Sequence, residues 1–239
     1  MLDHSHIPET GHLLWIDKPG ASFAIDVHVG KGGIASAAAL AHRKAKTGKS
    51  FAINGTFFYA GRLLGDALTL AGNLHLTSEP KARKRFGFAI TLFDQPTIYE
   101  RALLPEAPRE LEASYRATYH AALGGLGRLL AGGKNVADAA TLKDNSGQFF
   151  LDDAIRKTSR PALGIDKSGR LLVFVATEKE TPAHKGLRPA EMADVMQARG
   201  VTDAVFLDGG GSTSLAVNGK VLVKGGNDSS IPCWVIGYG

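Results

Sequence analysis

Cysteine is almost absent from this chain of 239 residues, in which Cys233 is the only one. A single cysteine excludes an internal disulfide framework and also excludes a zinc site built from several thiolates. An isolated cysteine behaves as a small apolar side chain when it is buried. We therefore expect Cys233 to lie in the core and to take no part in the chemistry.

Long apolar runs are missing as well. Stretches such as Leu171–Ala176 fall far short of the about 20 residues that a membrane-spanning helix needs. The N-terminal sequence MLDHSHIPETGH lacks the basic start and the apolar centre of a secretory signal peptide. We expect a cytoplasmic protein, or a periplasmic or secreted one if a leader was removed from a longer precursor.

Charge of one sign does not dominate, because 28 Lys and Arg residues stand against 23 Asp and Glu residues, for a formal net charge of +5. This mild excess is compatible with a partner that carries phosphate. The sequence has no basic strand interleaved with aromatic side chains of the kind that binds RNA. We therefore find no clear nucleic-acid signature, and the composition does not fix an oligomeric state.

Several common catalytic and nucleotide-binding motifs are also missing. Thr47–Ser50 resembles the end of a phosphate-binding loop, but Arg43 stands where the first glycine belongs. Gly125–Gly127 begins like a dinucleotide fingerprint, but Leu130 occupies the place of its third glycine. Neither His-Glu-x-x-His nor Gly-x-Ser-x-Gly occurs. These absences argue against a P-loop enzyme, a dinucleotide enzyme, a zinc protease and an α/β-hydrolase.

Glycine, in contrast, is abundant at 29 residues, which predicts many turns and close backbone approaches. The chain shows both strand-like and helix-like patterns, with no linker and no internal repeat. We predict an α+β fold, a single domain with a mixed, largely antiparallel central sheet flanked by helices. We expect residues 1–12 to form a flexible tail and residues 13–239 to form the domain. The histidines of the tail, His4, His6 and His12, could bind a metal as a cluster, but chain termini are usually disordered.

Local patterns predict individual elements within this domain. Helices are expected over 34–46, from residue 108 onward, and over 189–199, where proline suits the first turn and Gly200 ends the helix. Residues 121–134 are glycine-rich, and the polar segment 135–153 is expected to be a loop. Strands and hairpins are expected from alternation and turn residues at 22–29, 50–58, 68–76, 86–93, 162–176, 204–207, 215–223 and 232–238.

The most informative stretch for function runs from Leu207 to Ser214, where a predicted strand ends in Asp208 and three glycines follow. Three consecutive glycines cost chain entropy, which a fold accepts where the backbone curls tightly or a ligand approaches closely. The N–H groups of Gly209–Gly211 can form an anion-binding nest, and Ser212 and Thr213 add hydroxyl donors. A tight turn capped by its own aspartate is the structural alternative.

A second candidate is Asn54, which follows an apolar run in the segment Ala52–Phe58. A buried amide must be hydrogen-bonded, and it can orient a sugar hydroxyl or a phosphate oxygen. Phe57 and Phe58 could then wall a pocket. The structural alternative is an asparagine at a strand bulge beside two core phenylalanines.

A third candidate is Arg160, which stands just before the predicted strand that begins at Ala162. Its planar guanidinium suits a phosphate group. A solvated surface arginine is the alternative.

Taken together and in this order, these segments resemble the phosphodiester glycosidase family. The family includes an enzyme that removes N-acetylglucosamine from a phosphodiester, together with many bacterial proteins, and the resemblance points to a bacterial or phage member. It covers about residues 50 to 239. The matching segments are Asn-Gly-Thr-Phe-Phe at 54–58, Gly127–Lys134, Arg-Pro-Ala-Leu-Gly-Ile-Asp at 160–166, Pro189–Ala193 and Phe-Leu-Asp-Gly-Gly-Gly-Ser at 206–212.

The sequence departs from the family pattern at two places. Thr56 replaces the second glycine of the early segment. Many members carry Asp-Gly-Arg after the strand that follows the arginine segment, whereas this chain reads Ala176-Thr-Glu-Lys179. A carboxylate and an arginine are therefore missing there, and Glu178 or Glu180 is the available substitute.

The resemblance implies that the protein hydrolyses the glycosidic C–O bond of a small-molecule or glycan sugar-1-phosphodiester, most readily of the N-acetylglucosamine type. Asp208 would be the carboxylate that assists the oxocarbenium-like transition state, and Glu178 is the weaker choice for a second carboxylate. Arg160 and Gly209–Gly211 would hold the phosphate. Asn54 would orient the sugar or the phosphate, and Phe57 would line the site.

Two other classes of function stay open from the residues alone. The protein could be a non-catalytic binding module for sugar phosphates or phosphorylated glycans, if the missing Asp-Gly-Arg segment has removed turnover. It could also be a metal-dependent phosphodiesterase or nuclease. No cofactor is expected, and no clear ligand set supports a divalent cation such as calcium, although carboxylates and carbonyls in glycine-rich loops can hold one.

Overall fold

The computed structural model describes residues 1–8, 10–17, 19, 22–30, 32–77, 83–103, 109–137, 156–177 and 186–239. Helices are α1 (Gly33–Lys44), α2 (Arg109–Thr118) and α5 (Pro189–Gln197), with 3-10 turns η1 (Gly210–Ser212) and η2 (Asp228–Ser230). The strands are β1 (Leu2–Ile7), β2 (Gly11–Ile16), β3 (Ala24–Val29), β4 (Ser50–Asn54), β5 (Phe58–Tyr59), β6 (Arg62–Leu63), β7 (Ala67–Leu68), β8 (Leu74–His75), β9 (Arg83–Thr91), β10 (Pro96–Leu103), β11 (Tyr119–Ala131), β12 (Lys134–Asn135), β13 (Arg160–Asp166), β14 (Leu171–Ala176), β15 (Val201–Phe206), β16 (Leu215–Val217), β17 (Lys220–Val223) and β18 (Cys233–Tyr238).

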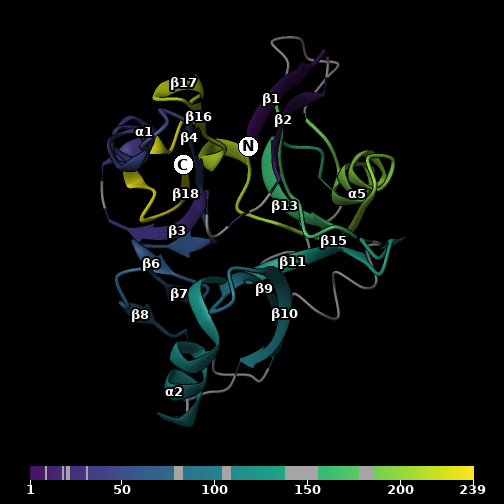
Figure 1. Ribbon diagram of the computed structural model, residues 1–239. Coiled ribbons are helices and arrows are strands. Elements are labelled where there is room, and N and C mark those ends of the chain that lie inside the picture. The colour runs from purple at the N-terminus through teal and green to yellow at the C-terminus, as the bar shows by residue number, and fades with distance from the viewer. Residues whose placement is uncertain are drawn as a thin grey trace.

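Two sheets and a short β5–β6 hairpin organise the fold (Figure 1). The larger sheet has the order β1-β2-β14-β13-β15-β11-β7-β8, with β9 and β12 also paired to β11 and β10 paired to β9. The smaller sheet has the order β17-β16-β4-β18-β3. Every pairing among the described strands is antiparallel. The α+β class and the antiparallel character are confirmed, with two sheets sharing the role predicted for one.

Strand β14 shows how the larger sheet is covered on both faces. All six of its residues are buried. Because side chains alternate across a strand, Leu171, Val173 and Val175 join one apolar cluster while Leu172 and Phe174 join another. A continuous apolar run in the sequence is therefore what a doubly covered strand requires.

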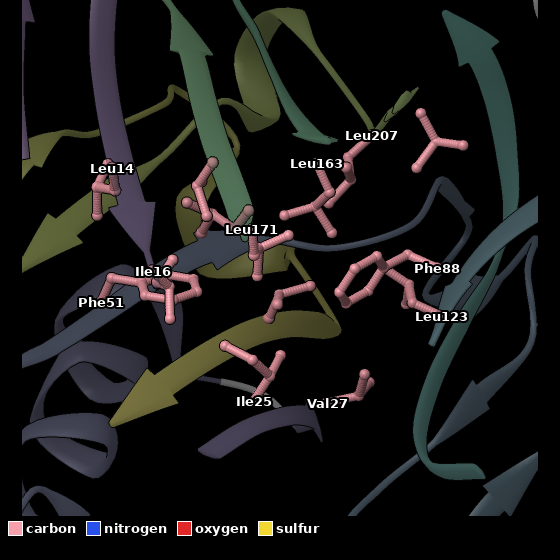
Figure 2. Packing of buried hydrophobic residues seen from close by; sticks show 14 of the residues in the cluster. Leu14, Ile16, Ile25, Val27, Phe51, Phe88, Leu123, Leu163, Leu171 and Leu207 are labelled. Atoms are coloured by element: carbon pink, nitrogen blue, oxygen red, sulfur yellow. The ribbon is translucent and has the colours of Figure 1, made fainter. Parts of the chain in front are cut away.

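The central core lies between the two sheets (Figure 2). Ile25 and Phe51 come from the smaller sheet, and Leu14, Leu163 and Leu171 come from the larger one. Burial of apolar side chains contributes about 25 cal/mol per Å² removed from water, so this shared cluster is the main interaction that holds the sheets together.

The helices cover the outer faces (Figure 1). Helix α1 packs Ile34, Ala37, Ala38 and Ala41 against the cluster behind the smaller sheet, in the i, i+3, i+4, i+7 pattern of an amphipathic helix. On α5, the residues Met192, Ala193 and Met196 pack against the larger sheet. Helix α2 contributes Tyr115 to a fourth cluster with β9 and β11.

The N-terminus of α1 is capped from a distance. Its N-cap residue, Gly32, makes no side-chain cap hydrogen bond, and the N–H of Ile34 donates instead to the carboxylate Oδ1 of Asp228 at 2.6 Å. Gly33 has a φ of 68°, and an added Cβ there would lie 2.6 Å from Asp228 Oδ2. Glycine is therefore required at this position for both the backbone angle and the space.

Residues 1–12 contain strands where a flexible tail was expected. Strand β1 pairs along its whole length with β2, from Leu2 opposite Ile16 to Ile7 opposite Gly11. Strand β2 then pairs with β14. The polar residues of β1 are exposed because it is the edge strand of the larger sheet, so a polar sequence here marks an edge rather than a tail.

Most local predictions agree with the structure. The helices expected from residue 108 and over 189–199 correspond to α2 and α5, and the hairpin around Asn218–Gly219 has positive φ at both turn residues, as a type I′ turn requires. The glycine-rich segment 121–134 is mostly the long strand β11. The loop predicted over 135–153 falls mostly outside the described residues.

Cys233 and the membrane prediction can be checked directly. The Cys233 side chain is fully buried, and burial raises the pKa of its thiol to about 12, so the expectation of a core residue is confirmed. Of the helices in the described part of the chain, none has both the length and the apolar character to span a membrane.

Asp166 holds the β13–β14 turn together and makes stability depend on pH. Its carboxylate accepts hydrogen bonds from the Ser168 N–H and hydroxyl and from the Arg170 N–H and Nε. Burial acts to raise the pKa of Asp166, but the hydrogen bonds from Ser168 and Arg170 outweigh it and hold the pKa below its usual value. The stabilisation is therefore present above the unfolded pKa of about 3.9 and lost as pH falls through the folded pKa.

Replacing Asp166 with Asn should lower the free energy of unfolding at pH 7 by about 1–2 kcal/mol, because the charge-assisted bonds weaken. The difference from the natural protein should shrink as the pH falls from the unfolded pKa of about 3.9 through the lower pKa that Asp166 has in the folded protein. Urea unfolding followed at several pH values measures this. Asp17→Asn, an exposed carboxylate, is the matched control, and an equal loss at pH 7 and pH 3 would contradict the argument.

Candidate functional site

The glycine-rich turn begins where β15 leaves the larger sheet. Leu207 is fully buried in the central core, and Asp208 follows it as a half-buried residue. The chain then forms the 3-10 turn η1 over Gly210–Ser212. The structure therefore places Asp208 at a strand end, as the sequence predicts, and the core fixes the residue immediately before it.

Asn54 connects this turn to the smaller sheet. It is the last residue of β4 and is 1% exposed. Its amide Nδ2 donates to the backbone oxygen of Asp208 at 2.7 Å, and its Oδ1 accepts from the N–H of Ser214 at 3.0 Å. One side chain thus binds both ends of the turn. The segments of Asn54 and Asp208, separated by 154 positions, meet directly.

The start of β13 forms the floor under the turn. The N–H of Gly210 donates to the backbone oxygen of Ser159 at 2.7 Å, and the Ser159 hydroxyl donates to the oxygen of Gly210 at 3.3 Å. A Cβ on Gly209 would lie 2.8 Å from the Ser159 oxygen and 2.9 Å from the Cβ of Arg160. Glycine at 209 is therefore needed for this close packing.

Arg160 is fully buried rather than a solvated surface residue. Its guanidinium carbon lies 4.9 Å from the centre of the Phe206 ring, a cation–π contact. The Phe206 ring in turn meets Phe57 edge-on at 6.3 Å between centroids. Asp208, Arg160 and Phe57 are thus brought into one neighbourhood, with Phe57 as a core residue that packs beneath the turn.

The N–H groups of the turn are largely engaged within the protein. The N–H of Gly209 donates to the carboxylate Oδ1 of its own neighbour Asp208 at 2.9 Å, and that of Gly210 donates to Ser159. The N–H groups of Ser212 and Thr213 close the turn onto Gly209 and Gly210. The turn is therefore built by internal bonds, and each of these four N–H groups donates to an acceptor within the protein.

The hydroxyl residues of the turn are buried. Ser212 is 4% exposed and Thr213 1% exposed. Within the part of the chain that the structure describes, the Thr213 hydroxyl is buried without a hydrogen-bond partner. A buried hydroxyl in that state carries unused hydrogen-bonding capacity within the turn.

Thr56, the residue that departs from the family pattern, has a specific contact. Its hydroxyl donates to the backbone oxygen of Gly124 in β11 at 2.8 Å. The N–H of Gly124 donates in turn to the backbone oxygen of Asp66. Thr56 therefore fastens the Asn54 segment to the larger sheet, and the change from glycine adds a hydrogen bond.

A second wall of the site was not found from the sequence. The N–H of Asn227, which precedes η2, donates to the backbone oxygen of Gly211 at 2.7 Å, and the N–H of Gly225 donates to the Ser214 hydroxyl at 3.2 Å. A pocket of about 530 Å³ adjoins this loop, and its described lining residues are Phe58, Ala60, Gly61, Ser229, Ser230 and Pro232. Only Phe58 was suspected from sequence, because small exposed loop residues give no local signal.

The second carboxylate stays a prediction, since Glu178 and Glu180 lie outside the described residues. In the part of the chain that is described, no group of three or more His, Cys, Asp or Glu side chains could hold a metal ion.

The three N-terminal histidines lie close together, with His4 Nε2 at 3.2 Å from His12 Nδ1. Burial, followed by the neighbouring His6 and His4, lowers the pKa of His12 to about 4.

Comparisons with known proteins show which family the chain resembles. A family model described as phosphodiester glycosidase matches residues 47–233. N-acetylglucosamine-1-phosphodiester alpha-N-acetylglucosaminidase of Mus musculus is 36% identical over 64 residues, which is 27% of this chain and 12% of the mouse protein. The chain therefore spans only a small part of that relative.

Solved structures show the same fold. The catalytic domain of the zebrafish N-acetylglucosamine-1-phosphodiester alpha-N-acetylglucosaminidase, auto-inhibited by its pro-peptide, is similar with a TM-score of 0.70 and 17% identity, covering 100% of this chain and 81% of that one. A hypothetical protein from Synechocystis is similar with a TM-score of 0.58 and 14% identity, covering 100% of this chain and 61% of that one.

The contact between Gly209 and β13 can be tested with a matched pair of glycine substitutions. Gly209 has extended backbone angles that alanine also adopts, so Gly209→Ala tests only the space against Ser159 and Arg160. We expect a loss of about 1–3 kcal/mol in the free energy of unfolding, as for an overpacked site. A Cβ on Gly226 would meet no atom within 4 Å, so Gly226→Ala should change stability by no more than about 0.5 kcal/mol. Equal effects in urea unfolding would contradict the packing argument.

The amide of Asn54 can be tested separately. Asn54→Ala should lower the free energy of unfolding by about 3 kcal/mol, because the buried Ser214 N–H and the Asp208 carbonyl both lose their partner. Urea unfolding measures the loss. Asn73→Ala, at an exposed turn, is the control and should stay within about 0.5 kcal/mol of the natural protein. A loss from Asn54→Ala no larger than the control's would show that the amide does not hold the turn.

Proposed function

Because the chain belongs to the phosphodiester glycosidase family, we propose that it hydrolyses the glycosidic C–O bond of a sugar-1-phosphodiester. The bond between the anomeric carbon and the phosphate oxygen breaks, and its electron pair leaves with the phosphate monoester. The oxygen of water adds to the anomeric carbon, and its proton is taken up by a base. The products are a free sugar and a phosphate monoester.

One observation carries this proposal: the specific family-like segment at 206–212 meets the family-like segment at 54–58. The Asn54 amide holds the backbone of Asp208 and Ser214, and the Asp208 carboxylate is half-buried at the end of a core strand. A carboxylate held in this way by rigid neighbours can face a developing positive charge without reorganising. This is the electrostatic requirement of an oxocarbenium-like transition state.

Asp208 is proposed as the carboxylate that assists this transition state. A phosphodiester leaving group already carries negative charge, so it needs positive charge nearby more than a proton. Arg160, which lies fully buried beside the turn, supplies a positive charge whose field acts more strongly in a medium of low dielectric constant. Glu178 remains our proposal for a second carboxylate that would activate water.

The substrate-binding roles are proposed with the geometry in mind. Asn54 acts by holding the turn, and any contact of its second amide N–H with the sugar or phosphate would be additional. The glycines of the turn leave room for close approach of a phosphate, with Gly211 its exposed member. Ser212 and Thr213 offer hydroxyls, and Phe57 supports the site from below through Phe206.

An N-acetylglucosamine-type sugar is the glycone that we propose. The support is the printed activity of two relatives, the mouse and zebrafish alpha-N-acetylglucosaminidases that act on N-acetylglucosamine-1-phosphodiester. A binding module without turnover and a metal-dependent phosphodiesterase are the alternatives that the experiment below separates.

We expect the protein to hydrolyse N-acetylglucosamine 1-(methyl phosphate) in heavy-oxygen water with the label in the sugar. The Asp208→Asn variant should lose about 10³-fold in rate, because the neutral amide cannot stabilise positive charge at the anomeric carbon. Mass spectrometry of the products and a rate assay measure both effects.

The control is Asp94→Asn, which removes an exposed carboxylate at a turn where φ is 59° and asparagine fits. It should retain the natural rate. Label in the phosphate would indicate P–O cleavage, and loss of the rate with a chelator would support the phosphodiesterase. Binding without turnover would support the binding module.

A further inference from the structure

The pocket beside η2 has both of its walls attached to the candidate site. One wall, Phe58 with Ala60 and Gly61, belongs to the β5–β6 hairpin that directly follows the Asn54 segment. The other wall, Ser229, Ser230 and Pro232, follows Asn227, whose N–H is bound to Gly211. Both sides of the pocket are therefore close in sequence to segments that hold the turn.

The position along the turn indicates which part of the substrate the pocket receives. The carboxylate stands at the first residue of the turn, Asp208, and the anomeric carbon must lie within its reach. The η2 side of the pocket begins at Ser229, two residues after Asn227, and Asn227 binds the other end of the turn at Gly211. The group that lies beyond the phosphate, as seen from the sugar, is therefore the one directed toward the pocket.

The described lining defines the chemistry of the occupant. Phe58 and Pro232 offer apolar surface, and Ser229 and Ser230 offer hydroxyls. No charged side chain belongs to this described lining. A pocket of about 530 Å³ lies within the range of small-molecule sites, which is about 300–1,000 Å³. These features suit an uncharged ring that has an apolar face and polar edges.

We propose that this pocket is the leaving-group subsite and that it selects phosphodiesters whose second alcohol carries an uncharged ring with an apolar face. The proposal rests on the proposed function, since it assigns the two ends of a sugar-1-phosphodiester to the two ends of the turn. It predicts that specificity for the second alcohol resides in β5–β6 and η2.

The test compares three esters that share N-acetylglucosamine 1-phosphate and differ in the second alcohol: methyl, benzyl and 2-carboxyethyl. A methylene or ethylene group separates each substituent from the phosphate, so their leaving-group abilities are similar. We expect kcat/KM for the benzyl ester to exceed that for the methyl ester by about tenfold, as filling an apolar pocket gives. The kcat/KM for the 2-carboxyethyl ester should be no higher than that for the methyl ester.

Ser229→Trp is the variant that fills the pocket. Ser229 is exposed, so the protein should keep its thermal midpoint, and the benzyl-to-methyl ratio should fall to within about twofold. Phe58→Leu, which removes the aromatic ring, should lower the same ratio in part. Ser114→Trp, on the exposed side of α2 outside the pocket lining, is the matched control and should keep the natural ratio.

The outcomes separate this inference from the proposed function. Equal kcat/KM for the benzyl and methyl esters, or an equal loss for both in Ser229→Trp, would overturn the subsite while the glycosidase activity stands. If no ester is hydrolysed, the proposed function fails. Calorimetry with benzyl phosphate then tests whether the pocket binds an aromatic ring. Weaker binding in Ser229→Trp than in Ser114→Trp would then support a ring-binding pocket, and equal binding would overturn it.

Discussion

The hydrogen bonds of one buried amide fix the candidate site. Asn54 belongs to the smaller sheet, while Asp208 is the continuation of β15 in the larger sheet, and the amide bridges both ends of the turn between them. The two sheets already share a core, so neither side of this bridge can shift without disturbing buried apolar contacts. The Asn54 side chain therefore couples the site geometry directly to the packing of both sheets.

Close backbone contacts reinforce this bridge. Gly209 lies against Ser159 and Arg160, and an added Cβ at Gly125, where φ is 74°, would lie 2.6 Å from Gly65. The Thr56 hydroxyl adds a further link by donating a hydrogen bond to the backbone oxygen of Gly124. Since backbone segments touch without side chains between them, the site has few ways to relax, and this suits a carboxylate that must keep its position.

The sequence predicts the parts of this fold that are encoded locally. The Asn218–Gly219 turn and the doubly buried β14 carry their own signals, and the Asp208 strand end follows from an apolar run that stops at glycines. Contacts between distant segments were not predictable. The cap of α1 comes from Asp228, 194 positions away, and β11 is a strand despite three glycines because β9 and β15 pair with it. A solvated surface arginine was the structural alternative for Arg160. The residue is instead fully buried, because β13 is packed on both of its faces.

The residues around the site differ in how well they should tolerate substitution. Asn54 and Gly209 are held by hydrogen bonds or close contacts on more than one side, so substitution at either residue disturbs the turn. The β5–β6 hairpin and η2 instead carry exposed residues such as Tyr59 and Ser229, where substitution changes the surface without changing the core. Under the proposed roles, substitutions in the β5–β6 hairpin and η2 would change the alcohol that the protein accepts and leave the cleavage chemistry unchanged, because the exposed side chains there lie outside the central core.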